Sequence, residues 1–129
     1  MYRKYQDLRV WNNAMQLVEY VYRLTSNYPD SEKYGLVSQM RRAAVSIPSN
    51  IAEGNGRGSD KDYKRFLTIA RGSLMELETQ IIVSARLGFI QNDPSVEQLV
   101  QTIYGQLNGL MNSLRVSEDE AGYAPSSRL

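Results

Sequence analysis

Apolar residues recur at spacings of three and four positions in four segments of the chain, which is the period of an amphipathic helix. These segments span residues 10–28, 36–51, 63–85 and 96–114. No internal repeat and no alternating strand pattern competes with them. Because short connections make successive helices antiparallel neighbours, the pattern predicts an all-α fold, an antiparallel up-down-up-down four-helix bundle.

The first segment carries two neighbouring apolar lines, one through Trp11 and Val18 and the other through Val10 and Leu17. Together these lines are wider than the core of a single bundle requires. We therefore expect this helix to bury surface against a second subunit as well. The alternative is that its aromatic residues simply lie half exposed.

Turn and capping residues separate the four segments. The Pro-Asp-Ser sequence at residues 29–31 is expected to end the first helix and cap the second, and residues 54–58, which include three glycines, are expected to form a loop. Ser59 then opens a capping-box-like start of the third helix, Gly88 ends that helix, and Asp93 caps the fourth.

The second helix contains Pro48. A proline in a helix interior removes one backbone hydrogen bond and clashes with the preceding turn, at a cost of about 3 kcal/mol. Since the apolar period continues on both sides of the proline, we expect one helix that is kinked at Pro48 rather than two helices.

A chain of 129 residues with 42% hydrophobic content suits one domain. We expect the bundle to occupy residues 1–117 and the small and charged residues 118–129 to form a disordered tail. The chain has no run of about eighteen apolar residues, and its start lacks the apolar stretch of a secretory signal. We therefore expect a cytoplasmic protein with no membrane partner.

The chain contains no cysteine and no histidine. This composition removes disulfides, thiolate nucleophiles, Ser-His-Asp machinery and the commonest transition-metal ligand. We expect no cofactor, no metal site and no catalytic residue. An enzyme that uses a metal or small molecule at Glu53, Glu76 or Glu78 is an alternative that the composition leaves open.

The net charge is only +1, but the charge is unevenly distributed. Residues 1–73 carry 12 Lys/Arg and 7 Asp/Glu, a net charge of +5, whereas residues 74–129 carry 3 and 7, a net charge of −4. The candidates for contact with nucleic-acid phosphate are Arg41, Arg42, Arg57, Lys61, Lys64, Arg65 and Arg71. Antiparallel packing would bring the four from Arg57 to Arg65 together at one end of the bundle. The alternative is an ordinary solvated charged face.

Short polar residues follow one side of the second helix. This polar stripe comprises Gln39, Ser46, Asn50 and Glu53, with Ser73 and Glu76 of the third helix across from it. We expect an interhelical hydrogen-bond network that fixes the register of the two helices. A ligand or partner site at the kink is the alternative.

Several motifs between residues 5 and 90 are more specific than a generic amphipathic helix. They are Tyr5-x-Asp7-Leu8-x-Val10-Trp11, Tyr34-Gly35-Leu36, Gln39-x-x-Arg42-Ala43-Ala44-x-Ser46-Ile47-Pro48-Ser49-Asn50-Ile51-Ala52-Glu53-Gly54, Phe66-Leu67 and Gly72-Ser73-Leu74-x-Glu76-Leu77-Glu78-Thr79. With these motifs the chain resembles the four-helix bundle family of 23S rRNA intervening-sequence proteins.

The resemblance implies a bundle that assembles as a ring, typically a homopentamer. Members are encoded within inserted sequences of bacterial 23S ribosomal RNA genes or elsewhere in bacterial genomes. A related branch is the accessory protein of diversity-generating retroelements, a basic pentameric barrel that associates with reverse transcriptase and nucleic acid; this chain differs from that branch in being nearly neutral. No catalytic residues are known for the family.

Two hypotheses about function follow. The first is a non-enzymatic homo-oligomer that binds nucleic acid, with structured RNA favoured over DNA by the genomic association of the family. The alternative is an oligomeric protein-interaction scaffold or adaptor, such as a partner of a reverse transcriptase.

Overall fold

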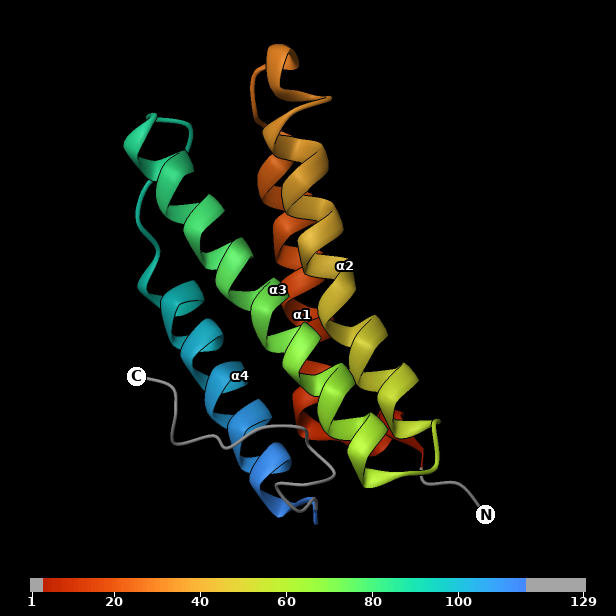
Figure 1. Ribbon diagram of the computed structural model, residues 1–129. Coiled ribbons are helices and arrows are strands. Elements are labelled where there is room, and N and C mark those ends of the chain that lie inside the picture. Colours follow the sequence, from red (N-terminus) through yellow and green to blue (C-terminus); the bar gives the residue numbers. More distant parts are fainter. Residues whose placement is uncertain (1–3, 116–129) are drawn as a thin grey trace, which may run out of the picture.

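The computed structural model describes residues 4–115, which form four α-helices and two short 3-10 helices. These elements are η1 (Tyr5–Asp7), α1 (Arg9–Thr25), η2 (Asp30–Glu32), α2 (Leu36–Asn55), α3 (Asp60–Arg86) and α4 (Pro94–Ser113). Successive helices run in opposite directions, and α3 lies between α2 and α4 in front of α1 (Figure 1). No strand occurs in this part of the chain. The all-α four-helix fold is thus confirmed.

Two expectations concern residues at the ends of the chain. The tail expected at residues 118–129, and the domain boundary at residue 117, lie outside the described residues.

Within residues 4–115, none of the helices combines the length and the apolar character that crossing a bilayer requires.

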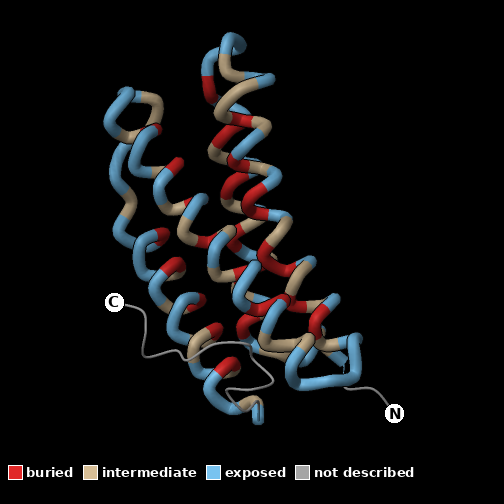
Figure 2. The backbone as a smooth tube through the Cα atoms, in the orientation of Figure 1, coloured by how far each residue is buried: buried red, intermediate tan, exposed pale blue. Residues whose placement is uncertain are grey.

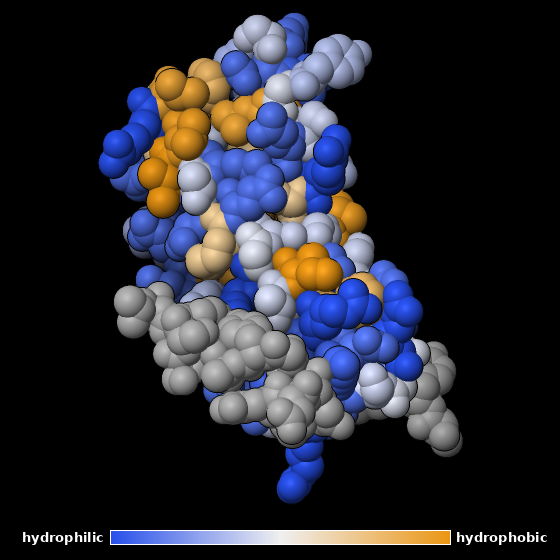
Figure 3. All heavy atoms as spheres, viewed as in Figure 1, coloured by the Kyte–Doolittle hydropathy of each residue, from blue (hydrophilic) through white to orange (hydrophobic). Residues whose placement is uncertain are grey.

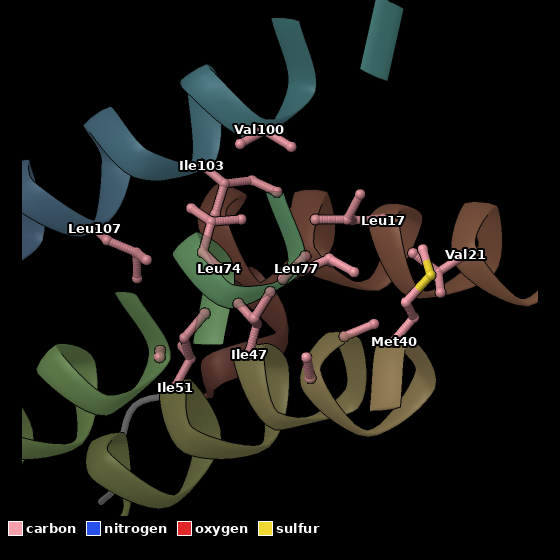
Figure 4. Close-up of a cluster of buried hydrophobic side chains, with 14 of the residues drawn as sticks. Leu17, Val21, Met40, Ile47, Ile51, Leu74, Leu77, Val100, Ile103 and Leu107 are labelled. Carbon is pink, nitrogen blue, oxygen red and sulfur yellow. The ribbon is translucent and has the colours of Figure 1, made fainter. Parts of the chain in front are cut away.

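The core is a column of apolar side chains contributed by all four helices (Figure 4). Buried positions lie on the helix faces that are turned toward other helices, and exposed positions lie on the outside (Figure 2). The largest fully buried hydrophobic side chains are Leu17, Met40, Ile47, Ile51, Leu67, Leu74, Leu77, Ile103, Leu107 and Val21. Burial of each such side chain contributes about 1.5–3 kcal/mol, so this column is the main source of stability.

The two apolar lines of α1 have different surroundings. Val10 and Leu17 are buried in the core, whereas Trp11 and Val18 are only partly buried at its edge. The first line therefore faces the other helices of the bundle. Coverage of the second line by another subunit stays a prediction.

Gly54 allows α2 and α3, the most extensively packed helix pair, to approach closely. A Cβ atom at position 54 would lie 2.8 Å from Phe66 Cβ and 3.0 Å from Tyr63 Cδ1, closer than packed carbon atoms normally lie. Gly54 and Asn55 belong to α2, so the prediction of a loop over the whole of residues 54–58 was wrong. Packing against α3 holds these residues in the helix although their local sequence favours a loop.

Three predicted helix ends are confirmed. The Asp62 N–H donates to Ser59 Oγ over 3.2 Å at the start of α3. Gly88 adopts a φ of 81° just beyond the end of α3, in the left-handed region that favours glycine. At the start of α4 the Ser95 N–H donates to Asp93 Oδ1 over 3.0 Å.

The predicted cap of α2 was wrong. Asp30 and Ser31 form part of the 3-10 helix η2, and α2 begins only at Leu36. The side chain that reaches its first turn is that of Glu32, whose Oε1 accepts the Leu36 N–H over 3.3 Å. Because Asp30 and Ser31 are held in the 3-10 turn, they lie too far from Leu36 along the chain to cap the helix.

The helix α2 is continuous through Pro48, which is buried. One helix rather than two is therefore confirmed for this segment. The kink expected at Pro48 stays a prediction.

Candidate functional site

Four basic residues lie where α2 turns into α3: Arg57, Lys61, Lys64 and Arg65. We call them the corner cluster; the turn that carries them is at the lower right of Figure 1. The ring of Phe66 organises two of them, since the guanidinium carbon atoms of Arg57 and Arg65 lie 4.8 Å and 4.7 Å from its centroid. Cation–π contacts of this kind restrict the positions of both guanidinium groups at the surface.

Both arginines of the corner cluster also pair with carboxylates. Arg57 lies 2.9 Å from Glu53, and Arg65 lies 3.5 Å from Asp62. Side chains of about half exposure gain only about 0.2–1 kcal/mol from such pairs. A phosphate group can therefore replace either carboxylate at little cost.

The two lysines complete the corner cluster. Neither Lys61 nor Lys64 forms an ion pair with any of the residues that the structure describes. Asp60 and Asp62 in the first turn of α3 complement the dipole of that helix. With Glu53, Asp60 and Asp62 beside it, the corner cluster carries a local net charge of only +1.

The other three predicted phosphate contacts lie elsewhere. Arg41 is near the opposite end of α2, more than about 20 Å along the helix axis from the corner cluster, and Arg42 follows it. Arg71 lies in the middle of α3, where its Nη1 donates to Asn108 Oδ1 of α4 over 2.8 Å. The structure therefore divides the seven basic candidates among three places.

Part of the polar stripe forms a contact between α2 and α3. The hydroxyl groups of Ser46 and Ser73 lie 2.8 Å apart. The Asn50 side-chain amide donates to the Ser46 carbonyl oxygen over 2.8 Å and to Ser46 Oγ over 2.9 Å. These three side chains connect the two helices near Pro48.

The remaining stripe residues do not join that contact. Glu53 pairs with Arg57 of its own segment, and Glu76 accepts from Gln80 Nε2 over 3.3 Å within α3. Gln39 lies exposed on α2. No group of acidic side chains within residues 4–115 is arranged to hold a metal ion.

Shifted pKa values belong to groups near the connection between α3 and α4. Burial raises the pKa of Tyr28, whose ring lies 5.4 Å from that of Phe89. The nearby hydroxyl group of Ser84 partly offsets this rise; it donates its own hydrogen bond to the Gln80 carbonyl oxygen over 2.8 Å. Burial likewise raises the pKa of Tyr20, and hydrogen bonds from Ser95 lower the pKa of Asp93.

Sequence reasoning missed a second basic surface around Arg41 and Arg42. The structure adds Tyr22, Lys33 and Tyr34 to it, where the end of α1 lies beside the start of α2. The adjacent Lys33 and Tyr34, placed just before a helix that contains an Arg-Arg pair, were the available signal in the sequence.

Comparison with protein families finds one match over most of the chain. The model described as 23S rRNA-intervening sequence protein matches residues 6–111. Comparison with curated proteins finds no significant match. The matched segment contains all four α-helices up to Met111 and both basic surfaces.

Proposed function

Because the chain belongs to the 23S rRNA-intervening sequence protein family, we propose that it is a non-enzymatic, oligomeric protein that binds structured RNA. The observation that carries the proposal is the corner cluster, in which two guanidinium groups contact one aromatic ring and two lysines have no ion-pair partner among residues 4–115. The association of the family with ribosomal RNA favours RNA over DNA as the ligand.

Oligomerisation explains how so small a net charge could support binding. Each phosphate contact releases counterions, and the contributions of several contacts add in the logarithm of the binding constant. One corner cluster offers few such contacts. Copies of the cluster repeated around an oligomer would act together on one RNA through their high effective concentration.

The test is the affinity for a structured RNA hairpin at several salt concentrations. We expect log K to fall linearly with log salt for the wild-type protein. The double variant Lys61→Glu, Lys64→Glu should bind more weakly and with a shallower slope. Arg57 is left in place because its contacts with Phe66 and Glu53 support the local structure.

The matched control compares the single variants Lys64→Glu and Arg86→Glu, which make the same charge change. Arg86 lies in the last turn of α3, at the other end of that helix from the corner cluster. A drop in affinity that is equal in both variants would show that only net charge matters. Absence of binding by the wild type at low salt would refute RNA binding altogether.

A second candidate function, a protein-interaction scaffold, is favoured by exposed apolar residues at the end of α3. Ile82, Val83 and Leu87 are 50%, 39% and 59% exposed. Hydrophobic residues gather on the upper left of the molecule, where α3 ends and α4 begins (Figure 3). A single protein partner that survives nuclease and high salt, and that the variant Leu87→Asp no longer retains, would support this candidate over RNA binding.

A further inference from the structure

An open groove lies between the end of α1, the turn that precedes α2, and the first turns of α2. Its lining residues are Tyr22, Lys33, Tyr34, Val37, Ser38, Arg41, Arg42, Val45 and Ser46. Its volume is about 680 Å³, within the range of about 300–1,000 Å³ that is usual for ligand sites. We call it the α1–α2 groove.

The α1–α2 groove is positively charged without compensation. Among residues 4–115, Lys33, Arg41 and Arg42 line it, and no carboxylate does. None of the three forms an ion pair with a residue in the described range 4–115. The corner cluster differs in this respect, because each of its arginines already contacts a carboxylate. An anionic ligand in the groove would therefore displace no acidic side chain.

Two tyrosines expose aromatic surface beside these charges. Tyr34 is 88% exposed and Tyr22 is 43% exposed. Lys33 Nζ lies 5.5 Å from the centroid of the Tyr34 ring, and the guanidinium carbon of Arg41 lies 4.5 Å from that of Tyr22. Surfaces that bind single-stranded nucleic acid commonly combine aromatic rings, on which bases stack, with cationic side chains that contact the backbone.

Arg41 is held in place before any ligand arrives. Its Nε donates to Thr25 Oγ1 over 2.9 Å, and its Nη2 lies 3.3 Å from the Tyr22 carbonyl oxygen. The guanidinium plane is thus fixed against Tyr22. Bases stack on guanidinium planes as well as on aromatic rings, so Arg41 and Tyr22 together form a rigid platform.

We propose that the α1–α2 groove binds unpaired bases of single-stranded RNA. Bases stack on Tyr34 and on the platform of Tyr22 and Arg41, while Arg42 and Lys33 contact the phosphates. An acidic peptide would satisfy the cations but would leave two exposed aromatic faces unused, whereas every base has a face that stacks. This inference rests on the proposed function, since it assigns the unpaired segments of the RNA to a surface distinct from the corner cluster.

The test measures the fluorescence anisotropy of a labelled oligouridylate of about ten nucleotides, a length within the usual site sizes. Loss of one stacked base lowers affinity roughly 5- to 150-fold, so Tyr34→Ala should show a loss of this order. Tyr34→Phe keeps the ring and should bind like the wild type. Arg42→Glu should weaken binding and make its salt dependence shallower.

The control is Tyr104→Ala, which removes a tyrosine of α4 that is 39% exposed and lies outside the groove. Its affinity for the oligouridylate should equal that of the wild type. Because Tyr34 is almost fully exposed, its replacement should leave the helical circular dichroism unchanged, and this is checked for each variant.

The outcomes separate this inference from the proposed function. If the wild type binds no RNA, both fail. If it binds the structured hairpin through the corner cluster but Tyr34→Ala binds oligouridylate as the wild type does, only the groove assignment is overturned. A change of assembly mass in Tyr34→Ala with unchanged RNA affinity would also overturn it and would identify the groove as a contact between copies.

Discussion

Replacement of Gly54 by alanine tests whether the close approach of α2 and α3 requires a residue without a side chain. The added Cβ would meet Phe66 Cβ at 2.8 Å, Tyr63 Cδ1 at 3.0 Å and the Tyr63 carbonyl oxygen at 3.3 Å. The first and third of these atoms belong to or adjoin the backbone of α3. They cannot rotate away, so the start of α3 must shift.

Two opposing terms set the size of the effect. Alanine is favoured over glycine in a helix interior by about 1 kcal/mol. Overpacking a close contact costs about 1–3 kcal/mol, and a separation below 3 Å from a backbone-linked atom places Gly54 at the upper end of that range. The expected net loss of stability for Gly54→Ala is about 1–2 kcal/mol.

Thermal unfolding by circular dichroism at a fixed protomer concentration measures this loss. A chain of this size loses roughly 3–5 °C in Tm per kcal/mol. Gly72→Ala and Gly105→Ala are the controls, because each is helical and no atom of the described part of the chain lies within 4 Å of the added Cβ. Both controls should gain about 0.5–1 kcal/mol. A rise in Tm for Gly54→Ala like that of the controls would refute the reasoning.

Three further predictions concern the interior. Alanine at both Ser46 and Ser73 should give a coupling energy of about 0.5–1.5 kcal/mol in a double-mutant cycle of urea denaturation; a coupling near zero would show that the contact adds nothing. Leu74→Ala should lower the free energy of unfolding by about 2–5 kcal/mol in the same assay, and a loss well below this would mean that the site is not tightly packed. Because the folded-state pKa of Tyr28 is raised above 10.0, the unfolded chain loses this proton first, so stability should fall as pH rises above that value. In urea denaturation over that pH range, the free energy of unfolding of Tyr28→Phe should fall less steeply than that of the wild type. Identical pH dependence in the two proteins would contradict a raised pKa of Tyr28.

The helical period predicted most of the fold because the core positions of a helix bundle recur at regular spacings along each helix. Leu17, Leu74, Leu77 and Ile103 lie at positions that the spacing assigns to inward faces, and all four are fully buried. Such positions depend on local spacing and on the need to remove apolar surface from water. Capping residues likewise act on neighbouring backbone groups, so their role is visible in the sequence.

The roles of the glycines were not predictable in this way. Gly54 stands next to three further loop-forming residues, and its local sequence favours a turn. Its actual role depends on Phe66, a residue of another helix. By contrast, no atom of the described residues 4–115 lies within 4 Å of a Cβ built at Gly72, in the middle of α3. Contacts between helices decide both cases, and helical spacing does not specify them.

The same limit applies to the candidate site. The sequence identified the basic residues and the grouping of the four from Arg57 to Arg65, but it did not reveal the second basic surface around Arg41 and Arg42. The ion pairs of Arg57 and Arg65 span only four and three residues of the chain, and the length of α2 separates Arg41 from the corner cluster, so these features are local ones. The α1–α2 groove depends on the contact between Tyr22 of α1 and Arg41 of α2. The helical spacing of the sequence does not predict this contact between helices.

Light scattering coupled to size-exclusion chromatography tests the central claim, an oligomer that binds RNA, most directly. The purified protein is run with and without a structured RNA at low and at high salt. We predict a mass that is a multiple of the 14.7 kDa protomer, and a heavier complex with RNA that forms at low salt and dissociates at high salt. A protomer mass under all conditions, with RNA eluting separately even at low salt, would contradict the account.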